Sequence, residues 1–520
     1  MVKVCILTAG KGSRLSNYGK IINKAILPIK EKAILSHIIE MFSSNHEFVI
    51  GTGYRRNDIK NYLKIAHPDL NIRYVKIKNY DGPGSGPGLS LLSCKKFLQE
   101  EFFFVPCDIL SNLKFKEKTT FKKNIFWCSK VIGKKTNQYL NFKHKKNKII
   151  KFIDKKIVKG KNFKSWSGLC YIKDHKIFWN SLKKENRKID REYQISNGFA
   201  DLIKHKNCNI KNIKWVDLGN LKNYENEKKK TQKFDFSKDK EHLYFVNNKV
   251  IKFSENQKNS KKKYYKFRLN KKVYPRNVKV LDNFLYYDFL EGDNFYDVAN
   301  DKNFKLLLIE LKKNLWIKKN VKQTHFKRKC YNFYNNKTLK RVKIFLKNNE
   351  NIDKIKSVNK LKVVSIKKIL DKIDWDNLYK GESYYIHGDL QFDNILKTKK
   401  KFKLIDWRSD FDNEINYGDI YYDFAKILGG IYLNYKQVKK NNFKVDFNKR
   451  FSKINFPKSK KYKSIENELR KFMLDNNFDF NKIKILQALI YLNMSPLHKP
   501  PFSYGLFLLA KYLLTKNLNK

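Results

Sequence analysis

Apolar residues in the first 110 positions fall into short segments that alternate between two kinds of spacing. Nearly continuous apolar runs predict buried strands at residues 3–8, 47–54, 72–77 and 101–109. Apolar residues recur every three or four positions, as in amphipathic helices, at residues 32–42, 57–66 and 88–98. Asn57 or Asp58 is expected to cap the second of these helices. Strands that alternate with helices predict a mostly parallel, doubly wound α/β sheet with helices on both faces, and such sheets bind ligands at the carboxyl ends of their strands.

The alternating pattern ends near residue 226. Residues 228–241 are charged and poor in aliphatic side chains, which predicts a linker between a first domain at residues 1–227 and a second at residues 242–520. The second domain opens with an apolar run that predicts a hairpin turning at Asn247 and Asn248. Most of the remaining pattern is helical.

Charge changes this picture only in part. The sequence holds 113 Lys and Arg against 49 Asp and Glu, a formal net charge of +64. Such an excess indicates either a nucleic-acid or membrane surface, or lysine that fills solvated faces. We favour the second interpretation, because Lys is spread along the whole chain together with abundant Asn, Ile, Tyr and Phe, and no Arg-rich cluster or nucleic-acid-binding module is evident. We therefore expect small-molecule substrates and no specific nucleic-acid partner.

Cysteine usage and the chain ends favour a cytoplasmic, soluble protein. The seven cysteines include no C-x-x-C pair, and Cys5 and Cys107 lie in apolar runs that predict core packing. The N-terminus lacks the long apolar region of a signal peptide. The apolar segment at residues 503–514 is too short to span a bilayer, so no membrane insertion is expected. The sequence leaves the oligomeric state open.

The first candidate chemistry lies in "LTAGKGSRL", residues 7–15, where a predicted strand runs into a glycine loop. Glycines let several backbone N–H groups converge on phosphate oxygens, and Arg14 offers two donors to one phosphate. The loop lacks the ending of a Walker A motif and is not a dinucleotide G-x-G-x-x-G. Taken alone, a glycine turn of this kind is as often structural as phosphate-binding.

Further motifs follow in order: "NKAILPI" with Lys24, "PCDI" with Asp108, "SWSGLCYI" with Gly168, "REYQISNGFADLI" with Glu192 and "WVDLGNLKNY" with Asp217. This ordered set resembles the sugar-phosphate nucleotidyltransferase family, which includes phosphocholine cytidylyltransferases, over roughly residues 1–227. The sequence departs from the family at Asn23, where a Pro is usual, and in the loop "DGPGSGPGLSLL", which is richer in Gly and Pro.

The resemblance implies a Rossmann-like nucleotidyltransferase domain with Mg²⁺ and an NTP, CTP or UTP, as substrate. Lys24 would hold the incoming phosphate monoester, and Arg14 would stabilise departing pyrophosphate. Asp108 and Asp217 would share Mg²⁺, although alone they also fit a strand-end cap and a turn residue. Gly168 and Glu192 would contact the substrate. The residues that would wrap the nucleotide are Leu7, Ala9, Gly10, Lys11, Gly12 and Ser13.

A second candidate site lies near the C-terminus. "HGDLQFDNIL" supplies Asp389 and Asn394, and "FKLIDW" supplies Asp406 after the next predicted strand. Phosphoryl transfer by kinases needs an Asp at the substrate hydroxyl and an Asn and a second Asp on Mg²⁺. The H-G-D and I-D-W forms resemble the aminoglycoside phosphotransferase and choline kinase group. This implies a bilobal, protein-kinase-like α+β domain that uses ATP.

Two further residues enter through this resemblance. Lys252 in "KVIKF" would hold the α- and β-phosphates of ATP, although no Glu partner for it is evident. Arg408 follows the predicted metal ligand Asp406, where choline kinases often carry an acidic residue. Arg408 would therefore repel choline and favour a neutral or anionic alcohol, or it turns away and pairs with Asp410 or Asp412.

The two resemblances together predict a bifunctional enzyme. One half would phosphorylate a small alcohol or sugar with ATP, and the other would transfer a nucleotidyl group from an NTP to that phosphate monoester, for decoration of surface polysaccharide or lipid. Two alternatives stay open. One is a choline or ethanolamine kinase joined to a CTP:phosphocholine cytidylyltransferase, and the other is a regulatory pseudoenzyme scaffold.

Overall fold

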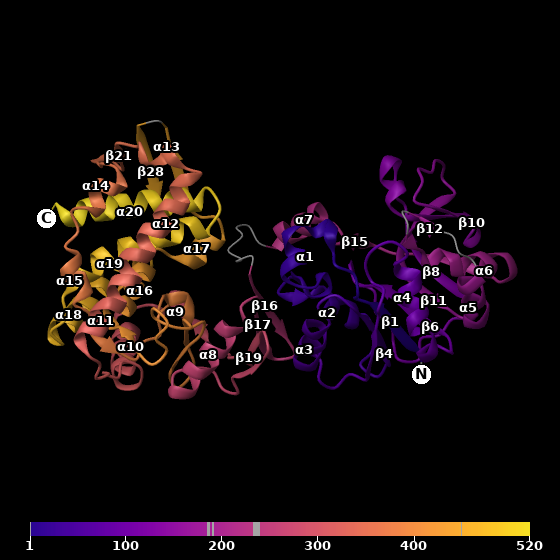
Figure 1. Cartoon of the computed structure of the whole chain (residues 1–520), viewed down its shortest axis with the longest axis horizontal. Helices are drawn as coiled ribbons and strands as arrows, with labels where there is room; N and C mark the ends of the chain where they lie inside the picture. Colours follow the sequence, from indigo (N-terminus) through magenta and orange to yellow (C-terminus); the bar gives the residue numbers. More distant parts are fainter. Residues whose placement is uncertain (1, 185–187, 190–191, 232–239, 449, 520) are drawn as a thin grey trace. The chain divides into compact units, whose positions relative to one another are not determined.

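The structure is a computed structural model that describes residues 2–184, 188–189, 192–231, 240–448 and 450–519. The chain divides into two compact units (Figure 1). The first unit comprises Met1–Thr231 and Asp239–Glu255, and the second is built mainly from Asn256–Lys520. Each unit is described by itself below.

Among the described residues of the first unit, nine strands form one mixed sheet in the order β5-β4-β1-β6-β11-β8-β14-β10-β9. The strands are β1 Lys3–Leu7, β4 Phe48–Thr52, β5 Ile72–Lys76, β6 Phe102–Pro106, β8 Asn124–Ser129, β9 Leu140–Lys145, β10 Lys148–Asp154, β11 Phe163–Ile172 and β14 Cys208–Asn212. The helices are α1 Asn17–Ile21, α2 Ile34–Ile39, α3 Arg56–Ala66, α4 Pro87–Cys94, α5 His175–Lys184, α6 Phe199–His205 and α7 Leu221–Thr231.

The sheet is fully parallel only in its first half, and its second half is mixed, with β14 parallel to β8. Strands β5, β4, β1 and β6 run parallel, as the sequence predicts. Strand β11 returns antiparallel to both β6 and β8, and β10 pairs antiparallel with β14 and β9. The prediction of a mostly parallel sheet was therefore wrong for the second half. Apolar runs reveal buried strands but not the direction in which distant strands pair.

Side chains alternate between the two faces along each strand, so apolar residues cover both faces of this sheet. Cys5, Val49 and Phe104 point to one face, where they pack with α4, α5 and α6 through residues such as Leu91 and Trp179. This cluster is a continuous apolar core. It fixes the carboxyl ends of β1 and β6, from which the candidate site is built.

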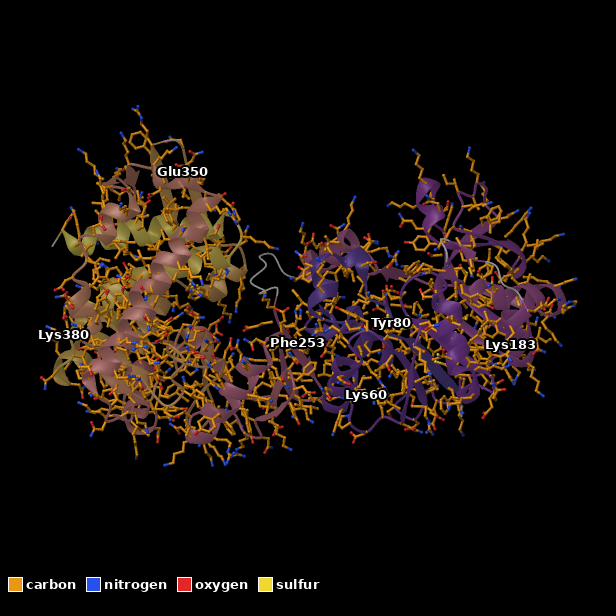
Figure 2. The ribbon with its side chains drawn as sticks, in the orientation of Figure 1. Lys60, Tyr80, Lys183, Phe253, Glu350 and Lys380 are labelled. Atoms are coloured by element: carbon orange, nitrogen blue, oxygen red, sulfur yellow. The ribbon has the colours of Figure 1, made fainter. Side chains whose placement is uncertain are left out.

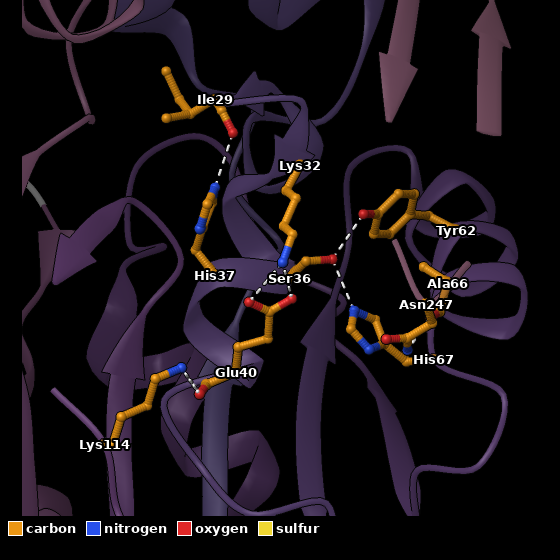
Figure 3. A network of polar contacts seen from close by, with 10 residues as sticks. All are labelled: Ile29, Lys32, Ser36, His37, Glu40, Tyr62, Ala66, His67, Lys114 and Asn247. Atoms are coloured by element: carbon orange, nitrogen blue, oxygen red, sulfur yellow. Dashed lines mark hydrogen bonds and ion pairs between the residues drawn. The ribbon is translucent and has the colours of Figure 1, made fainter. Parts of the chain in front are cut away.

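The hairpin of β16 Glu241–Val246 and β17 Lys249–Ser254 turns at Asn247 and Asn248, both with positive φ, which confirms the predicted turn. The hairpin groups with the first unit, whereas the sequence had suggested that residues from 242 belong with the second. Tyr244 donates through its hydroxyl to the Ile26 carbonyl at 2.7 Å. Figure 3 shows Asn247 close to the end of α3, where its amide donates to the Ala66 carbonyl at 2.9 Å.

A buried polar network lies next to this contact. The Ser36 hydroxyl is 2.7 Å from both the Tyr62 hydroxyl and His67 Nε2 (Figure 3). Burial lowers the pKa of His67 to about 4. His67 is therefore neutral at physiological pH, and the network ties α2 to α3 without a buried charge.

The linker predicted at residues 228–241 is only partly described. Residues 228–231 form the last turn of α7, so the helix extends further than the sequence suggested. Residues 232–239 lie outside the described residues. Residue 240 precedes β16, which begins at Glu241.

The second unit is mainly helical. Its helices are α8 Gln257–Leu269, α9 Phe295–Val298, α10 Asp301–Asn314, α11 Gln323–Tyr331, α12 Lys337–Lys347, α13 Glu350–Asp353, α14 Ile366–Leu370, α15 Trp375–Tyr379, α16 Ile420–Tyr432, α17 Tyr435–Lys439, α18 Tyr462–Asp475, α19 Phe480–Met494 and α20 Phe502–Leu518. Strands β18 Lys279–Leu281 and β19 Phe284–Asp288 form a hairpin, and β24 Ile395–Lys397 pairs with β25 Phe402–Leu404. Helix α16 is buried on every side along most of its length, as expected of a central helix.

All seven cysteines are free and buried. The side chains drawn in Figure 2 carry nitrogen-tipped ends over the surfaces of both units, in keeping with lysine on solvated faces. Among the described residues, no helix is long and apolar enough to cross a membrane.

Candidate functional site

The glycine loop of the first unit leaves β1 with an open backbone. A side chain at Gly10 would meet no atom within 4 Å, whereas Gly12 adopts φ +68° and lies against Lys24. A Cβ at Gly19 of α1 would lie 2.7 Å from the Gly12 carbonyl oxygen, so α1 packs directly behind the loop. The close packing requires glycine at position 19. The loop is thereby held open towards solvent at Gly10.

Asn23 holds the next segment against this loop. Its buried amide donates to the carbonyls of Thr8 and Tyr54, both at 2.8 Å, while its Oδ1 accepts from Ala25 N at 2.9 Å. The side chain thus joins the ends of two strands and caps the short 3₁₀ helix Lys24–Ile26. Sequence reasoning noted Asn23 only as a departure from the family pattern and missed this positioning role.

Lys24 is consequently directed at the end of β6. Its ammonium lies 2.7 Å from Asp108 Oδ2, and both side chains are 17% exposed. Burial pushes the pKa of Asp108 upward, but Lys24 and then Arg14 outweigh it, so this pKa ends below its ordinary value. Burial alone would lower the pKa of Lys24, yet Asp108 raises it above its ordinary value. Both groups are therefore charged at neutral pH.

A second carboxylate meets the first through a short strand pair. Strand β15 Trp215–Asp217 runs antiparallel to β7 Ile109–Ser111, with Asp217 opposite Ile109. A Cβ at Gly219 would lie 2.9 Å from Asp108 Oδ2, 3.0 Å from Asp217 Oδ1 and 3.4 Å from Arg14 Nη2. Three charged groups therefore surround one glycine. Burial raises the pKa of Asp217, which the Gly219 N–H at 2.7 Å only partly offsets.

The two carboxylates fit a divalent cation. Asp108 and Asp217 present hard oxygen donors on either side of Gly219, and Mg²⁺ commonly takes one or two carboxylates and completes its shell with substrate phosphates and water. Among the described residues, no cluster of three or more His, Cys, Asp or Glu is placed to hold a metal. A two-carboxylate site is consistent with that observation.

The other residues predicted for this site are spread around its rim. Leu7 ends β1, Ala9 is buried beside Gly53, and Ser13 is exposed. The ammonium of Lys11 pairs with Asp81 at 2.5 Å, a partner that the sequence did not suggest.

Gly168 and Glu192 have different surroundings. Gly168, at φ +94°, lies against Pro106, two residues before Asp108. Glu192 is exposed on the short strand β13 Glu192–Tyr193. Its neighbour Tyr193 donates through its backbone N–H to the Ser85 carbonyl at 2.8 Å, which places β13 beside the Gly/Pro loop. No contact joins Glu192 to Lys24 or Asp108 among the described residues.

The second candidate site is built around the turn between His387 and Asn394. The Asn394 amide donates to the Asp389 carbonyl at 2.9 Å, and the Asn394 carbonyl accepts from Ile405 N at 2.9 Å. Asp406 follows at once, with φ +56°. These bonds bring together Asp389, Asn394 and Asp406 from either side of the β24–β25 hairpin. Asn394 Oδ1 and the Asp406 carboxylate, which Lys263 contacts, would be the oxygen donors to a cation here.

Buried groups from α16 and the turn itself brace this arrangement. Asp423 accepts from Gly388 N at 2.7 Å and from His387 N at 2.8 Å, through separate oxygens. His387 is fully buried, and its Nδ1 accepts from Asp389 N at 3.2 Å. Burial lowers the pKa of His387 to about 3, so its neutral ring donates through Nε2 to the Ile405 carbonyl at 3.1 Å. Asp423 thus braces the backbone of the turn at His387 and Gly388.

Two lysines that the sequence did not single out contact the acidic groups. Lys426 of α16 lies 2.7 Å from Asp389 Oδ1, and Lys263 of α8 lies 3.3 Å from Asp406 Oδ1. Neither residue stands near its partner in the sequence. Lys252 lies on β17 and groups with the first unit, so its predicted role toward ATP stays a prediction.

Arg408 contacts Asp410, as in the second alternative that the sequence left open, but it bonds the backbone carbonyl and not the carboxylate. Its backbone N–H donates to the His387 carbonyl at 3.1 Å, and its Nε donates to the backbone carbonyl of Asp410 at 2.9 Å. The Asp410 carboxylate instead pairs with Lys262 at 3.0 Å. The Arg408 guanidinium lies 4.9 Å from the centre of the Phe333 ring.

Comparison with known proteins places the first unit in a class. Residues 4–111 match the family model of the MobA-like NTP transferase domain. The matched segment begins in β1 and includes the glycine loop, Lys24 and Asp108. This segment of the first unit is therefore similar to an NTP transferase domain, the class that the sequence motifs predicted.

Two curated relatives share this part of the chain. The bifunctional protein GlmU of Methanocaldococcus jannaschii is 28% identical over 220 residues, which cover 41% of this chain and 50% of the relative. The protein of the same name from Methanococcus maripaludis is 30% identical over 106 residues, which cover 20% of this chain and 24% of the relative. The chain thus spans half or less of the length of these relatives.

Solved structures that are similar to part of this chain include a UDP-glucose pyrophosphorylase complexed with UDP-glucose. It is 18% identical, and the match covers 44% of this chain and 98% of that chain with a TM-score of 0.37. A putative glucose-1-phosphate thymidylyltransferase from Bacillus anthracis is 17% identical, with 46% of this chain and 98% of that chain covered and the same TM-score of 0.37.

Proposed function

We propose that the first unit transfers a nucleotidyl group from an NTP to a small phosphate monoester, most simply a sugar phosphate, and releases pyrophosphate. The observation that carries the proposal is the convergence of Lys24, Asp108, Asp217 and Arg14 beside the open glycine loop. A phosphate oxygen of the monoester attacks the α-phosphorus as the bond to pyrophosphate breaks. Two anions must approach each other, and fixed cations lower that barrier.

Each charged group has a distinct part in this reaction. Lys24 would orient the monoester, and Arg14 would accept charge on departing pyrophosphate. Asp108 and Asp217 would hold Mg²⁺, which when bound neutralises phosphate charge at the reacting centre. Asn23 keeps Lys24 in place through its contacts with Thr8 and Tyr54.

The test measures pyrophosphate release from CTP, UTP, ATP and GTP with a panel of sugar phosphates and phosphocholine. One pair should react, and Asp217→Asn should lower kcat/KM by about a hundredfold or more, as loss of a group that acts in the transition state does. Lys20→Gln, an exposed lysine on α1, is the matched control for Lys24→Gln. Pyrophosphate release that survives in both Asp217→Asn and Lys24→Gln would refute this assignment.

We further propose that the second unit phosphorylates a small alcohol with ATP and so supplies the monoester. The hydrogen bonds that join Asp389, Asn394 and Asp406 support this second activity. Asp389 would accept the proton of the substrate hydroxyl, and Asn394 and Asp406 would hold Mg²⁺ with the ATP phosphates. The combined product, an NDP-linked compound, suits the decoration of surface polysaccharide or lipid.

Crossed variants separate the two activities. Asp389→Asn should abolish ADP formation from an alcohol panel but leave nucleotidyl transfer from a supplied monoester intact. Asp217→Asn should do the reverse. If one variant, shown to be folded by circular dichroism, removes both activities, the assignment of one reaction to each unit is wrong.

A further inference from the structure

Four basic side chains lie close to one another, and one of them contacts Asp389. We call them the basic cluster: Lys337 and Arg341 on α12, Arg408 after β25, and Lys426 on α16. Lys426 reaches Asp389 directly, at 2.7 Å. Lys337 and Arg408 lie over the Phe333 ring, and Lys337 and Lys426 lie near the Tyr422 ring. Arg341 lies one turn further along α12 and acts electrostatically on Lys337.

The aromatic rings fix the places of these cations. Phe333 lies in a π-helical turn, Asn332–Asn336, an irregularity often found at functional sites. The Lys337 ammonium lies 3.3 Å from the centre of the Phe333 ring, and the Arg408 guanidinium is 4.9 Å from it. Lys337 and Lys426 lie 5.8 and 6.0 Å from the Tyr422 ring. Both contacts are favourable for a cation, but neither neutralises its charge.

The basic cluster contains more basic side chains than acidic neighbours that pair with them. Lys426 pairs with Asp389, whereas Asp410 pairs with Lys262. Within the part of the chain that the structure describes, the guanidinium groups of Arg341 and Arg408 donate only to backbone carbonyls, those of Asn493 and Asp410. Among the described residues, no hydrogen bond or ion pair reaches the Lys337 ammonium. Burial, followed by Arg408 and Arg341, lowers the pKa of Lys337 well below its ordinary value, and an anion beside Lys337 would oppose that shift and favour its charged form.

We propose that the basic cluster binds an acidic group, a carboxylate or a phosphate, on the alcohol that the second unit phosphorylates. The inference rests on the kinase activity proposed above and specifies its substrate class: a small molecule with both a hydroxyl and an anionic group. The hydroxyl oxygen attacks the γ-phosphorus of ATP, the bond from that phosphorus to the β–γ bridging oxygen breaks, and the proton passes to Asp389. The acidic group lies meanwhile among Lys337, Arg341 and Arg408.

The same charges disfavour choline and ethanolamine. A quaternary ammonium needs aromatic faces that are free of other cations or an acidic neighbour. Here Lys337 and Arg408 already lie on the Phe333 ring, and Lys426 occupies the acidic group nearest to it. A cationic substrate would meet uncompensated like charge at short range.

The test uses the full-length protein and sets of alcohols that differ mainly in charge. ADP formation is measured with three sets of alcohols. The first set is glucuronate, glucose and glucosamine, and the second is glycolate, ethylene glycol, ethanolamine and choline. The third set compares glycerol 3-phosphate with glycerol. We expect an acidic member to exceed its neutral and cationic counterparts at least tenfold in kcat/KM. The glycerol 3-phosphate arm separates phosphate from carboxylate as the recognised group.

Variants then locate the anion. Lys337→Gln and Arg341→Gln should raise KM for the acidic alcohol tenfold or more and change kcat and the KM for ATP little. Lys343→Gln, an exposed lysine on the same helix, is the matched control and should behave as the parent protein does. A higher KM for ATP with every alcohol would instead mean that the cluster holds nucleotide phosphates, and would overturn the proposal.

A binding measurement keeps this inference separate from the kinase proposal. Thermal unfolding of the second unit within the full-length protein is followed with sulfate and with glucuronate. Chloride at equal ionic strength is the control for both anions, and glucose is the neutral counterpart of glucuronate. Stabilisation by the anions that is lost in Lys337→Gln but kept in Lys343→Gln supports the anion site even if no alcohol is phosphorylated. A different outcome is that the protein phosphorylates choline or a neutral alcohol best, with an activity that Asp389→Asn removes. That result would support the kinase proposal and overturn the proposed acidic substrate. No anion effect on either turnover or unfolding would also overturn the inference.

Discussion

Asn23 shows how one residue replaces a family feature by a different physical means. Its backbone has φ −65°, close to the value that proline imposes, so the usual Pro would fit the local chain direction. What a Pro cannot supply is the amide that bonds the carbonyls of Thr8 and Tyr54. The sequence shows only that Asn stands where Pro is usual in the family it resembles. The structure shows that hydrogen bonds of this Asn hold the segment that carries Lys24.

We predict that Asn23→Ala and Asn23→Pro both destabilise the first unit, because each leaves two carbonyl groups without their donor. The expected loss is about 2–4 kcal/mol in the free energy of unfolding, from three hydrogen bonds at about 1 kcal/mol each. Nucleotidyl transfer should fall more in the Ala variant, whose chain is less restrained ahead of Lys24. Urea unfolding and pyrophosphate release test both points, and equal stability of the parent and both variants would contradict them.

His67 predicts a dependence of stability on pH. Its pKa is about 4 in the folded chain against an ordinary value of 6.5, with burial as the main cause, so the unfolded chain binds the proton first. The contribution of His67 to stability is therefore complete above pH 6.5 and is lost as the pH falls towards 4. The loss amounts to about 3 kcal/mol over this window.

The pH prediction is tested with His67→Gln, which keeps a polar group near Ser36 but does not titrate. Unfolding of the first unit should depend less on pH between 6.5 and 4 in this variant than in the parent. His205→Gln on the exposed end of α6 is the control and should keep the parental slope. Identical slopes in His67→Gln and the parent would mean that His67 is not neutral in the fold.

At the scale of elements, α16 organises the second unit. One face of this helix supplies Asp423 to the backbone of His387 and Gly388, and the next turn supplies Lys426 to Asp389. Both residues lie far from their partners in the chain, and only tertiary packing of α16 brings them together.

Asp423→Ala should lower the free energy of unfolding of the second unit by about 3 kcal/mol or more. It removes the acceptor of two buried backbone N–H groups and of Trp316 Nε1, and buried donors without acceptors are costly. Asp423→Asn retains one acceptor oxygen and should cost less. Hydrogen exchange at the amides of His387 and Gly388 reads out the effect locally, and unchanged protection in the Ala variant would argue against the brace.

The hairpin β16–β17 gives a second prediction at this scale. Tyr244→Ala should destabilise the first unit, because Tyr244 is fully buried, stacks edge-on against Tyr62 and bonds the Ile26 carbonyl. Leu243→Ala, next to it but exposed, is the control and should change little. Hydrogen exchange of α3 amides would show the difference, and equal effects of the two variants would contradict the grouping of the hairpin with this unit.

The order of strands and helices up to residue 110 was predictable because local apolar spacing determines it. The runs at residues 3–8 and 101–109 became β1 and β6, which carry the glycine loop and Asp108. The start of α3 was less predictable: the helix begins at Arg56, and Asp58 accepts from the Arg55 side chain instead of capping the helix. The antiparallel return of β11 depends on pairing between distant segments, which local spacing does not encode.

At the scale of the whole molecule, charge governs encounter with substrates. A net charge of +64 creates a field that attracts nucleotides and phosphate esters, and salt screens it over about 10 Å at 0.1 M. We predict that KM for the NTP rises severalfold between about 20 and 300 mM NaCl while kcat stays nearly constant. Steady-state kinetics at a series of salt concentrations test this, and a KM that does not respond would mean that only local contacts capture the nucleotide.

The distribution of the buried thiols has a practical consequence. Cys5, Cys94, Cys107, Cys128, Cys170 and Cys208 lie in the first unit, and Cys330 lies in the second. A thiol reagent reaches these sulfurs only when the surrounding structure opens, because all seven are buried. Mass spectrometry of the labelled chain therefore reports the opening of each unit by itself. A gain of six labels marks the first unit and a gain of one label marks the second, without any change to the sequence.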